Sequence, residues 1–227
     1  MLSLFITLAT LAANTSTKEI KFRALCLAHP ELELGVRDAE GKIETFKVYA
    51  HTLSSEKTTS ASEGKILLLR AEKNLAGKIN WKPFVSAKVP AALGSIILII
   101  SGEQAAPKTT VVSDPVEKAQ GGSFRFFNTC PYAVGINLAG FKKILASGTE
   151  TFCLPNLAHA TYGQGQLFTS DQSSGWRAAG GMRWLHLNDI RTLWFIAPDP
   201  SNPNLVTVHG IEERVQGPTC TISLTNL

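Results

Sequence analysis

The sequence lacks the motifs that identify most enzyme classes and metal sites. No G-x-S-x-G elbow, P-loop or H-E-x-x-H motif occurs in its 227 residues. No pair of its four cysteines has C-x-x-C spacing, and no two of its five histidines lie at metal-ligand spacing. We therefore predict no catalytic residues, no metal and no cofactor.

Charge is also scarce. Charged residues make up 18% of the chain and hydrophobic residues 44%, a composition that argues against disorder. The 22 basic and 18 acidic residues give a net charge of +4, and the basic residues are scattered along the chain. This pattern does not predict a nucleic-acid partner. The length leaves room for one large or two ordinary domains.

Apolar runs long enough to span a bilayer, about 20 residues, are absent as well. Residues 95–101 (SIILIIS) are intensely apolar but only strand length. Residues 2–13 form an uncharged apolar run followed by small and polar residues, which fits residues 1–13 as a secretory signal peptide. No Lys or Arg precedes the run, so a misassigned start or a first strand is the alternative. We expect an exported protein, periplasmic or extracellular.

Strand patterns fill the rest of the chain. No long window has a helical stripe of apolar residues, whereas short alternating or apolar segments are separated by Gly, Asn, Ser and Pro. The lone Gly163-Gln164-Gly165 predicts a turn. Expected strands in the first half lie at 19–28, 32–36, 43–49, 65–70 and 95–101.

The second half repeats the first. Phe22-Arg23 and Phe124-Arg125 are 102 residues apart, and residues 97–100 align with 193–196 at a shift of 96. At that shift EKAQG aligns with ERVQG. We predict an internal duplication giving an all-β protein of two tandem immunoglobulin-like β-sandwich domains, residues 18–121 and 122–227. The aligned identities are Ile100/Ile196, Pro107/Pro203, Val112/Val208, Glu117/Glu213, Gln120/Gln216 and Gly121/Gly217.

The segment FRFFNTCPYAVGINLAG, residues 124–140, resembles the opening of a family of secreted bacterial β-sandwich domains. Their first strand and turn read R-V-V-N-A-S-P-D, followed by V-D-V-Y and a glycine. Arg125, Asn128, Pro131 and Gly140 match, while Cys130 stands in place of Ser. Two further departures are Tyr132 and Asn137, each in place of Asp. The resemblance implies an exported, often tandem sandwich, and it brings no catalytic residues.

The four cysteines suggest disulfides in an exported protein. Cys130 and Cys153 lie at the ends of neighbouring expected strands, so they are the predicted pair. The alternative is that Cys26, Cys130, Cys153 and Cys220 are buried thiols.

The most function-like feature is aromatic. Tyr162, Trp176 and Trp184 share a Gly-rich stretch with Arg177 and Arg183, a combination able to stack on sugar rings or to anchor a protein partner. The alternative places the tryptophans in the core. Trp176 has a counterpart in the first half, Trp81, which favours the core for Trp176, whereas Trp184 has none and is the better candidate for exposure.

These features favour a non-catalytic binding or structural module at the bacterial envelope, used in protein–protein or surface assembly. One alternative is a carbohydrate-binding protein that uses Trp184, Tyr162, Arg183 and Trp176. Another is a hydrolytic enzyme with its site between the two domains.

Overall fold

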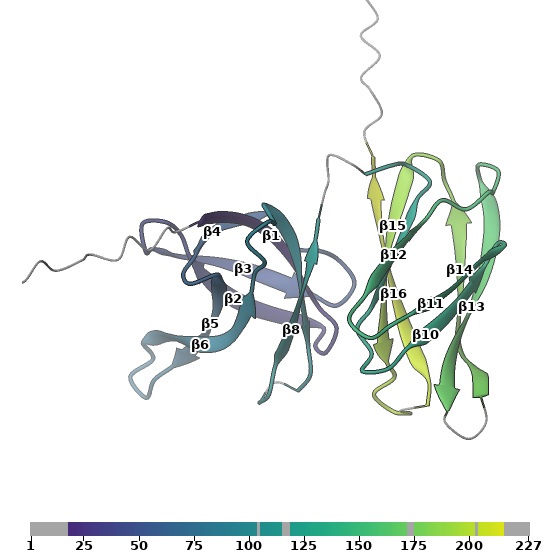
Figure 1. The fold of residues 1–227 in the computed structure, drawn as a ribbon. Helices are drawn as coiled ribbons and strands as arrows, with labels where there is room; N and C mark the ends of the chain where they lie inside the picture. The colour runs from purple at the N-terminus through teal and green to yellow at the C-terminus, as the bar shows by residue number, and fades with distance from the viewer. Residues whose placement is uncertain (1–17, 104, 115–118, 172–174, 203, 216–227) are drawn as a thin grey trace, which may run out of the picture.

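The structure, a computed structural model, describes residues 18–103, 105–114, 119–171, 175–202 and 204–215, without the side chain of residue 171. The expected signal segment 1–13 and Cys220 lie outside the described residues. All sixteen elements in the described part are β-strands, which confirms the all-β prediction (Figure 1). No helix there could cross a bilayer.

The first eight strands form two four-stranded sheets. Their orders are β4-β1-β7-β8 and β3-β2-β5-β6, and β1 and β7 are parallel neighbours. The strands are β1 Lys18–Cys26, β2 Glu31–Arg37, β3 Ile43–Tyr49, β4 Lys57–Ala61, β5 Lys65–Lys73, β6 Ile79–Lys88, β7 Ser95–Ser101 and β8 Lys108–Ser113.

The last eight strands repeat this arrangement. Their sheets have the orders β12-β9-β15-β16 and β11-β10-β13-β14, with β9 and β15 parallel, so each strand of the first half has a counterpart eight strands later. The strands are β9 Phe124–Asn128, β10 Val134–Leu138, β11 Phe141–Leu145, β12 Glu150–Cys153, β13 Thr161–Asp171, β14 Gly175–His186, β15 Ile190–Pro198 and β16 Val206–Arg214.

The strand order is not that of an immunoglobulin domain. There the first, second, fifth and fourth strands share one sheet and the third strand lies in the other. Here β2 and β3 are paired neighbours in one sheet, and β1 lies between β4 and β7 in the other. The described residues of each half form eight strands, whereas an immunoglobulin domain of the constant type has seven.

The registers refine the alignment of the halves. In the parallel strands Phe22 pairs with Ile96, and Phe124 pairs with Thr192. The shift of 102 that relates β1 to β9 and the shift of 96 that relates β7 to β15 therefore describe the same pairing in both halves. Ile100 pairs with Thr109, whereas Ile196 pairs with Val208. Strand β8 therefore corresponds to β16 at a shift of 99, because the connecting loops differ in length. Val112 and Val208, identical at a shift of 96, are therefore not structurally equivalent.

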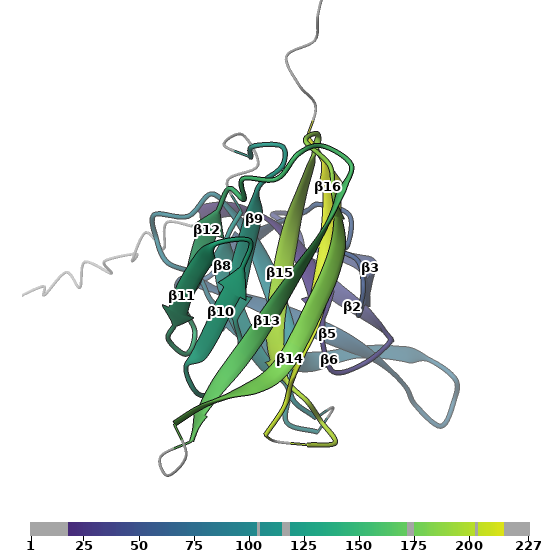
Figure 2. The same cartoon turned by 90° about the vertical axis from the view of Figure 1, so that its right-hand side faces the viewer.

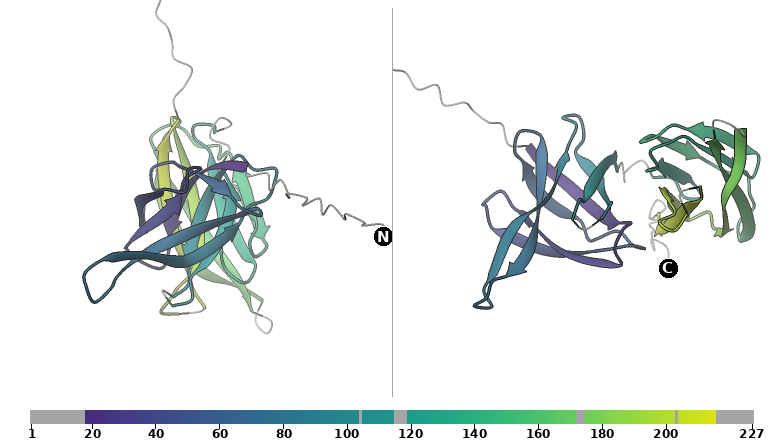
Figure 3. Two further views of the ribbon diagram at one scale, coloured as in Figure 1. Left: turned by 90° about the vertical axis from the view of Figure 1, so that its left-hand side faces the viewer. Right: turned by 90° about the horizontal axis from the view of Figure 1, so that it is seen from below.

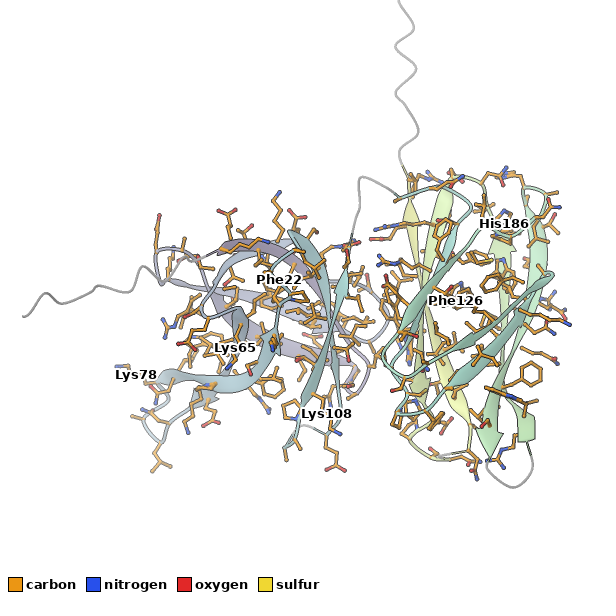
Figure 4. All side chains as sticks on the ribbon, viewed as in Figure 1. Phe22, Lys65, Lys78, Lys108, Phe126 and His186 are labelled. Atoms are coloured by element: carbon orange, nitrogen blue, oxygen red, sulfur yellow. The ribbon has the colours of Figure 1, made fainter. Side chains whose placement is uncertain are left out.

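Each half has its own core between its two sheets. Alternating strands direct one set of side chains inward, and Phe22 and Phe126 lie in the middle of the two cores (Figure 4). The first core takes its residues from seven strands, β1 to β7, and the second from all eight, β9 to β16. The coarse prediction of packed β-sheets is thereby confirmed.

A third core joins the halves. Strands β7 and β15 are apolar on both faces, and their outer side chains pack against each other between the sheets that contain them. Phe127 and Phe195 stack there with ring centroids 4.9 Å apart. The four sheets are therefore stacked in four layers (Figure 1). The buried members are Leu25, Ile97, Ile99, Phe127, Leu193, Phe195 and Ile211.

A compact group of charges closes one end of this junction. Asp114, completely buried, accepts hydrogen bonds from Arg23 Nε at 2.9 Å and from Arg191 Nη2 at 3.3 Å. Glu213 binds both arginines too, with Arg191 Nε at 2.9 Å. Burial alone would raise the pKa of Glu213, but the two guanidinium groups lower it below its ordinary value.

Asp114 and Glu213 are 99 residues apart, the shift that relates β8 to β16. The two acids therefore occupy corresponding positions in the two halves. Two positive and two negative charges balance within the group, so the junction carries no buried excess charge.

This arrangement leaves two sheets with an outer face open to solvent. The sheet β3-β2-β5-β6 lies at one end of the stack and β11-β10-β13-β14 at the other (Figures 1 and 2). Any large surface for a ligand or partner on the flat of a sheet must lie on one of these two.

We expect the Asp114→Ala variant to lose about 3 kcal/mol of unfolding free energy, because both arginines lose a buried partner. Urea denaturation measures this. The Glu31→Ala variant, which removes an exposed pair with Lys47, should lose less than about 1 kcal/mol. Equal losses would show that the buried group does not stabilise the junction.

Candidate binding face on the second half

The outer face of the sheet β11-β10-β13-β14 carries exposed aromatic rings at its two ends. Tyr162 is 65% exposed and Trp176 is 45% exposed. Tyr162 pairs with Leu185, and Trp176 pairs with Ser170, eight residues further along β13. At about 3.3 Å per residue the rings are attached about 26 Å apart.

The Trp176 ring is held flat against the sheet. A side-chain carbon at Gly135 would lie 3.3 Å from the ring and 3.3 Å from Phe168, so the indole crosses from β14 over β13 to reach β10. Ile144 and Lys142 on β11 line the same hollow. The glycine is what allows this approach, because any larger residue would displace the ring.

The Tyr162 ring is covered in part by a cation. The guanidinium carbon of Arg183 lies 5.0 Å from the ring centroid, a cation–π distance. Arg177, the other arginine of that stretch, instead donates to Asn204 Oδ1 at 2.5 Å.

The face is hollowed in two places, one lined by amides and the other mainly by apolar side chains. Two adjoining hollows of about 680 and 640 Å³ share Asn137. Gly165 and Gly181 have no side chains to fill the first hollow, and Gln164 and Gln166 line it with amide groups. The sequence analysis missed these amides, although strand alternation places Gln164 and Gln166 on the same side as Tyr162.

The described outward-facing side chains of this sheet include cations and no acid. Arg183 lines the first hollow, and Lys142 and Lys143 line the second. The face therefore offers amide and cationic hydrogen-bond donors between aromatic rings. We call the set Tyr162, Gln164, Gln166, Phe168, Trp176, Arg183, Asn137, Ile144 and Lys142 the aromatic face.

The prediction that Trp184 is exposed on the surface is wrong. Trp184 is only 5% exposed and packs in the core of the second half, edge-on to Phe124 at 5.1 Å. Its partner across the strands is Gly163, and its ring lies where a side chain at Gly163 would be. Gly163-Gln164-Gly165 is therefore strand, not turn, because its glycine makes room for the indole.

The prediction that Trp176 lies in the core, because it has a counterpart in the first half, is also wrong. Trp81 does correspond to it, since the Trp81 ring lies about 3 Å from where a side chain at Gly35 would begin. Both tryptophans lie on outer faces, where they cover a glycine. The two halves thus share the contact between tryptophan and glycine rather than burial of the tryptophan.

The predicted Cys130–Cys153 disulfide is also wrong. Cys26, Cys130 and Cys153 are free and buried. Strand β12 runs antiparallel to β9, so Cys153 pairs with Phe124, while Cys130 lies beyond the opposite end of β9. The four-residue advance from Phe124 to Asn128 alone covers about 13 Å, and a disulfide needs Cα atoms within about 7 Å.

A groove of about 660 Å³ between the halves was the expected place for an enzyme site. It is lined by His29, Ser101, Glu103 and His209 among apolar residues. His209 stacks on His51 from the other half, with centroids 5.6 Å apart. Burial, then the charge of His51, lower the pKa of His209. In the described residues no three His, Cys, Asp or Glu side chains are placed to hold a metal.

No protein-family model matches the chain, and no curated protein matches it in sequence.

We expect the buried thiols to resist alkylation. Burial raises the pKa of Cys130 to about 11 and also raises the pKa of Cys26 and Cys153, so few thiolates form. In a Cys220→Ser variant, iodoacetamide at pH 8 should label no cysteine in the native state and three in guanidinium. Labelling of only one after unfolding would reveal a disulfide.

We expect the protein to lose stability as pH falls below about 6.5. The pKa of His209 is lowered in the folded state, so the unfolded chain binds more protons below the ordinary histidine pKa. Glu212 lines the hollow that also holds His51 and could offset part of the effect. The Tm difference between pH 7.5 and 5.5 should narrow in His209→Gln. An unchanged difference would exclude this histidine as the cause.

Proposed function

We propose that the protein is a non-catalytic binding module and that its aromatic face holds an extended glycan chain. The observation that carries the proposal is the pair of exposed rings, Tyr162 and Trp176, on one sheet face that also holds two adjoining hollows, the first lined by amides and the second by the Trp176 ring and apolar side chains. The flat sheet beneath fixes the spacing of these groups.

The chemistry of sugars matches this order of groups. A sugar ring has an apolar face of C–H groups that stacks on an aromatic ring, and hydroxyls around its edge that exchange hydrogen bonds with amides. Trp176 and Tyr162 supply the rings. Asn137, Gln164 and Gln166 supply donors and acceptors between them.

A protein partner fits the face less well. Protein interfaces concentrate apolar side chains at the centre and polar ones at the rim. Here the polar amides and two glycines are central, while Trp176 and Tyr162 lie at the ends. Two aromatic rings attached about 26 Å apart on one sheet face, with an amide-lined hollow on the same face, suit a linear polymer better than a compact protein surface.

The duplication and the location belong to the same proposal. We propose that the halves are two copies of one eight-stranded domain, residues 18–121 and 122–227, which the identical strand orders support. We also propose that the protein is exported to the periplasm or beyond, which the apolar residues 2–13 support. Glycans of the cell envelope would be accessible there.

We expect the Trp176→Ala and Tyr162→Ala variants each to weaken glycan binding by at least about tenfold, since each removes a stacking ring. Affinity electrophoresis through hydroxyethyl cellulose, arabinoxylan, galactomannan and laminarin measures retardation. Leu154→Ser, an exposed apolar residue of the same half but outside the aromatic face, is the matched control.

Retardation of the wild type by at least one polymer, lost in the two aromatic variants and kept in Leu154→Ser, supports the proposal. If no polymer retards the wild type, or if all three variants behave alike, the glycan assignment is wrong.

A further inference from the structure

The hairpin of β5 and β6 extends well beyond the body of the first half (Figure 3). Its tip carries Leu75, whose relative exposure is 111%, and Ile79, which is 51% exposed. Lys78 lies at the same end (Figure 4). At this apex the Leu75 side chain is not covered by the fold, so it is accessible to a surface outside the chain.

The tip has a defined shape. The side chain of Asn74 accepts hydrogen bonds from the backbone N–H groups of Ala76 at 3.0 Å and Lys78 at 2.9 Å. The backbone N–H of Asn74 donates to Lys78 O at 3.0 Å, and Gly77 takes a φ of +76° that favours glycine. Leu75 is thus presented by a closed turn rather than by a loose loop.

The hairpin also concentrates the positive charge of the protein. Residues 65–88 contain six basic residues and one acidic residue, a net charge of +5, whereas the whole chain has +4. The rest of the chain therefore has a net charge of −1. The acid, Glu72, is paired with Lys82 at 2.6 Å, which leaves Lys73 and Lys78 as the exposed cations beside Leu75. The basic residues are Lys65, Arg70, Lys73, Lys78, Lys82 and Lys88.

We propose that the tip of this hairpin docks on the surface of an anionic lipid bilayer. Leu75 and Ile79 enter the boundary between headgroups and acyl chains, and Lys73 and Lys78 contact lipid phosphates. The charge of the hairpin complements such a surface, and its apolar apex fits the layer just beneath it.

The apolar apex is what separates a bilayer from other anionic partners. A nucleic acid or an acidic protein would be bound by the lysines alone, and would leave Leu75 and Ile79 in water. A bilayer takes up both kinds of side chain at once. The contact is weak and reversible, because two apolar residues and two nearby lysines provide less than a single fatty-acyl anchor.

Membrane docking is independent of the proposed glycan binding. The hairpin belongs to the outer sheet of the first half, and the aromatic face belongs to the outer sheet of the second half, at the other end of the stack (Figures 1 and 3). The full chain could hold both ligands together, and either activity could be lost without the other.

Vesicle flotation tests the proposal with the full-length chain. Vesicles of equal phosphatidylglycerol and phosphatidylcholine are compared with phosphatidylcholine alone at millimolar lipid and 0.1 M salt. We expect binding to the anionic vesicles only. Leu75→Ser should lower the partition coefficient about tenfold, and Lys73→Gln and Lys78→Gln about fivefold each.

Matched controls are Leu154→Ser, an exposed leucine of the other half, and Lys108→Gln, an exposed lysine outside the hairpin. Both should bind like the wild type, and every variant should keep the thermal unfolding midpoint of the wild type because the substituted side chains are exposed. Absence of vesicle binding by the wild type overturns the proposal. So does binding that Leu75→Ser leaves unchanged, or tighter binding to duplex DNA than to anionic vesicles.

Discussion

The structure depends on covering both faces of the sheets that contain β7 and β15. Such strands cannot lie at a water-exposed surface, since each would leave several large apolar side chains in water. The other sheet of the same half covers one face, and the corresponding sheet of the other half covers the second. The balanced charges of Arg23, Asp114, Arg191 and Glu213 then close one end of this contact. The broad sheet surfaces open to a ligand are therefore those of the two outermost sheets.

Contact between tryptophan and glycine is a second recurring constraint. All four tryptophans pack where a side chain on a particular glycine would stand: Trp81 on Gly35, Trp176 on Gly135, Trp184 on Gly163 and Trp194 on Gly210. Two of these contacts lie inside the second half's core and two lie on outer faces. The same local device therefore yields a core filler in one case and an exposed ring in another. Whether the tryptophan is buried or exposed depends on which face of the sheet its side chain points to.

Strand content and the apolar character of residues 95–101 were predictable, because each is a property of neighbouring residues. Tyr162 and Arg183 lie together because β13 pairs with β14. The exposure of Trp184 and Trp176 was predicted the wrong way round, since sequence spacing does not show which face of β14 turns inward. The disulfide failed because the direction of β12 relative to β9 is a tertiary property. The hairpin charge was overlooked because its lysines are scattered in sequence and gather only when two strands pair.

The sequence by itself determined that this chain forms short strands, in two similar halves, with little charge and few reactive groups. The strands follow from local alternation and composition, which act over a few residues at a time, and the similarity of the halves follows from comparing segments about 100 residues apart. Only the tertiary structure decided which sheets face each other, which aromatic rings reach water, and that one hairpin projects with a leucine at its tip. These depend on strand pairing and on sheet packing between residues far apart in the chain, where the competing arrangements differ in buried area rather than in local preference.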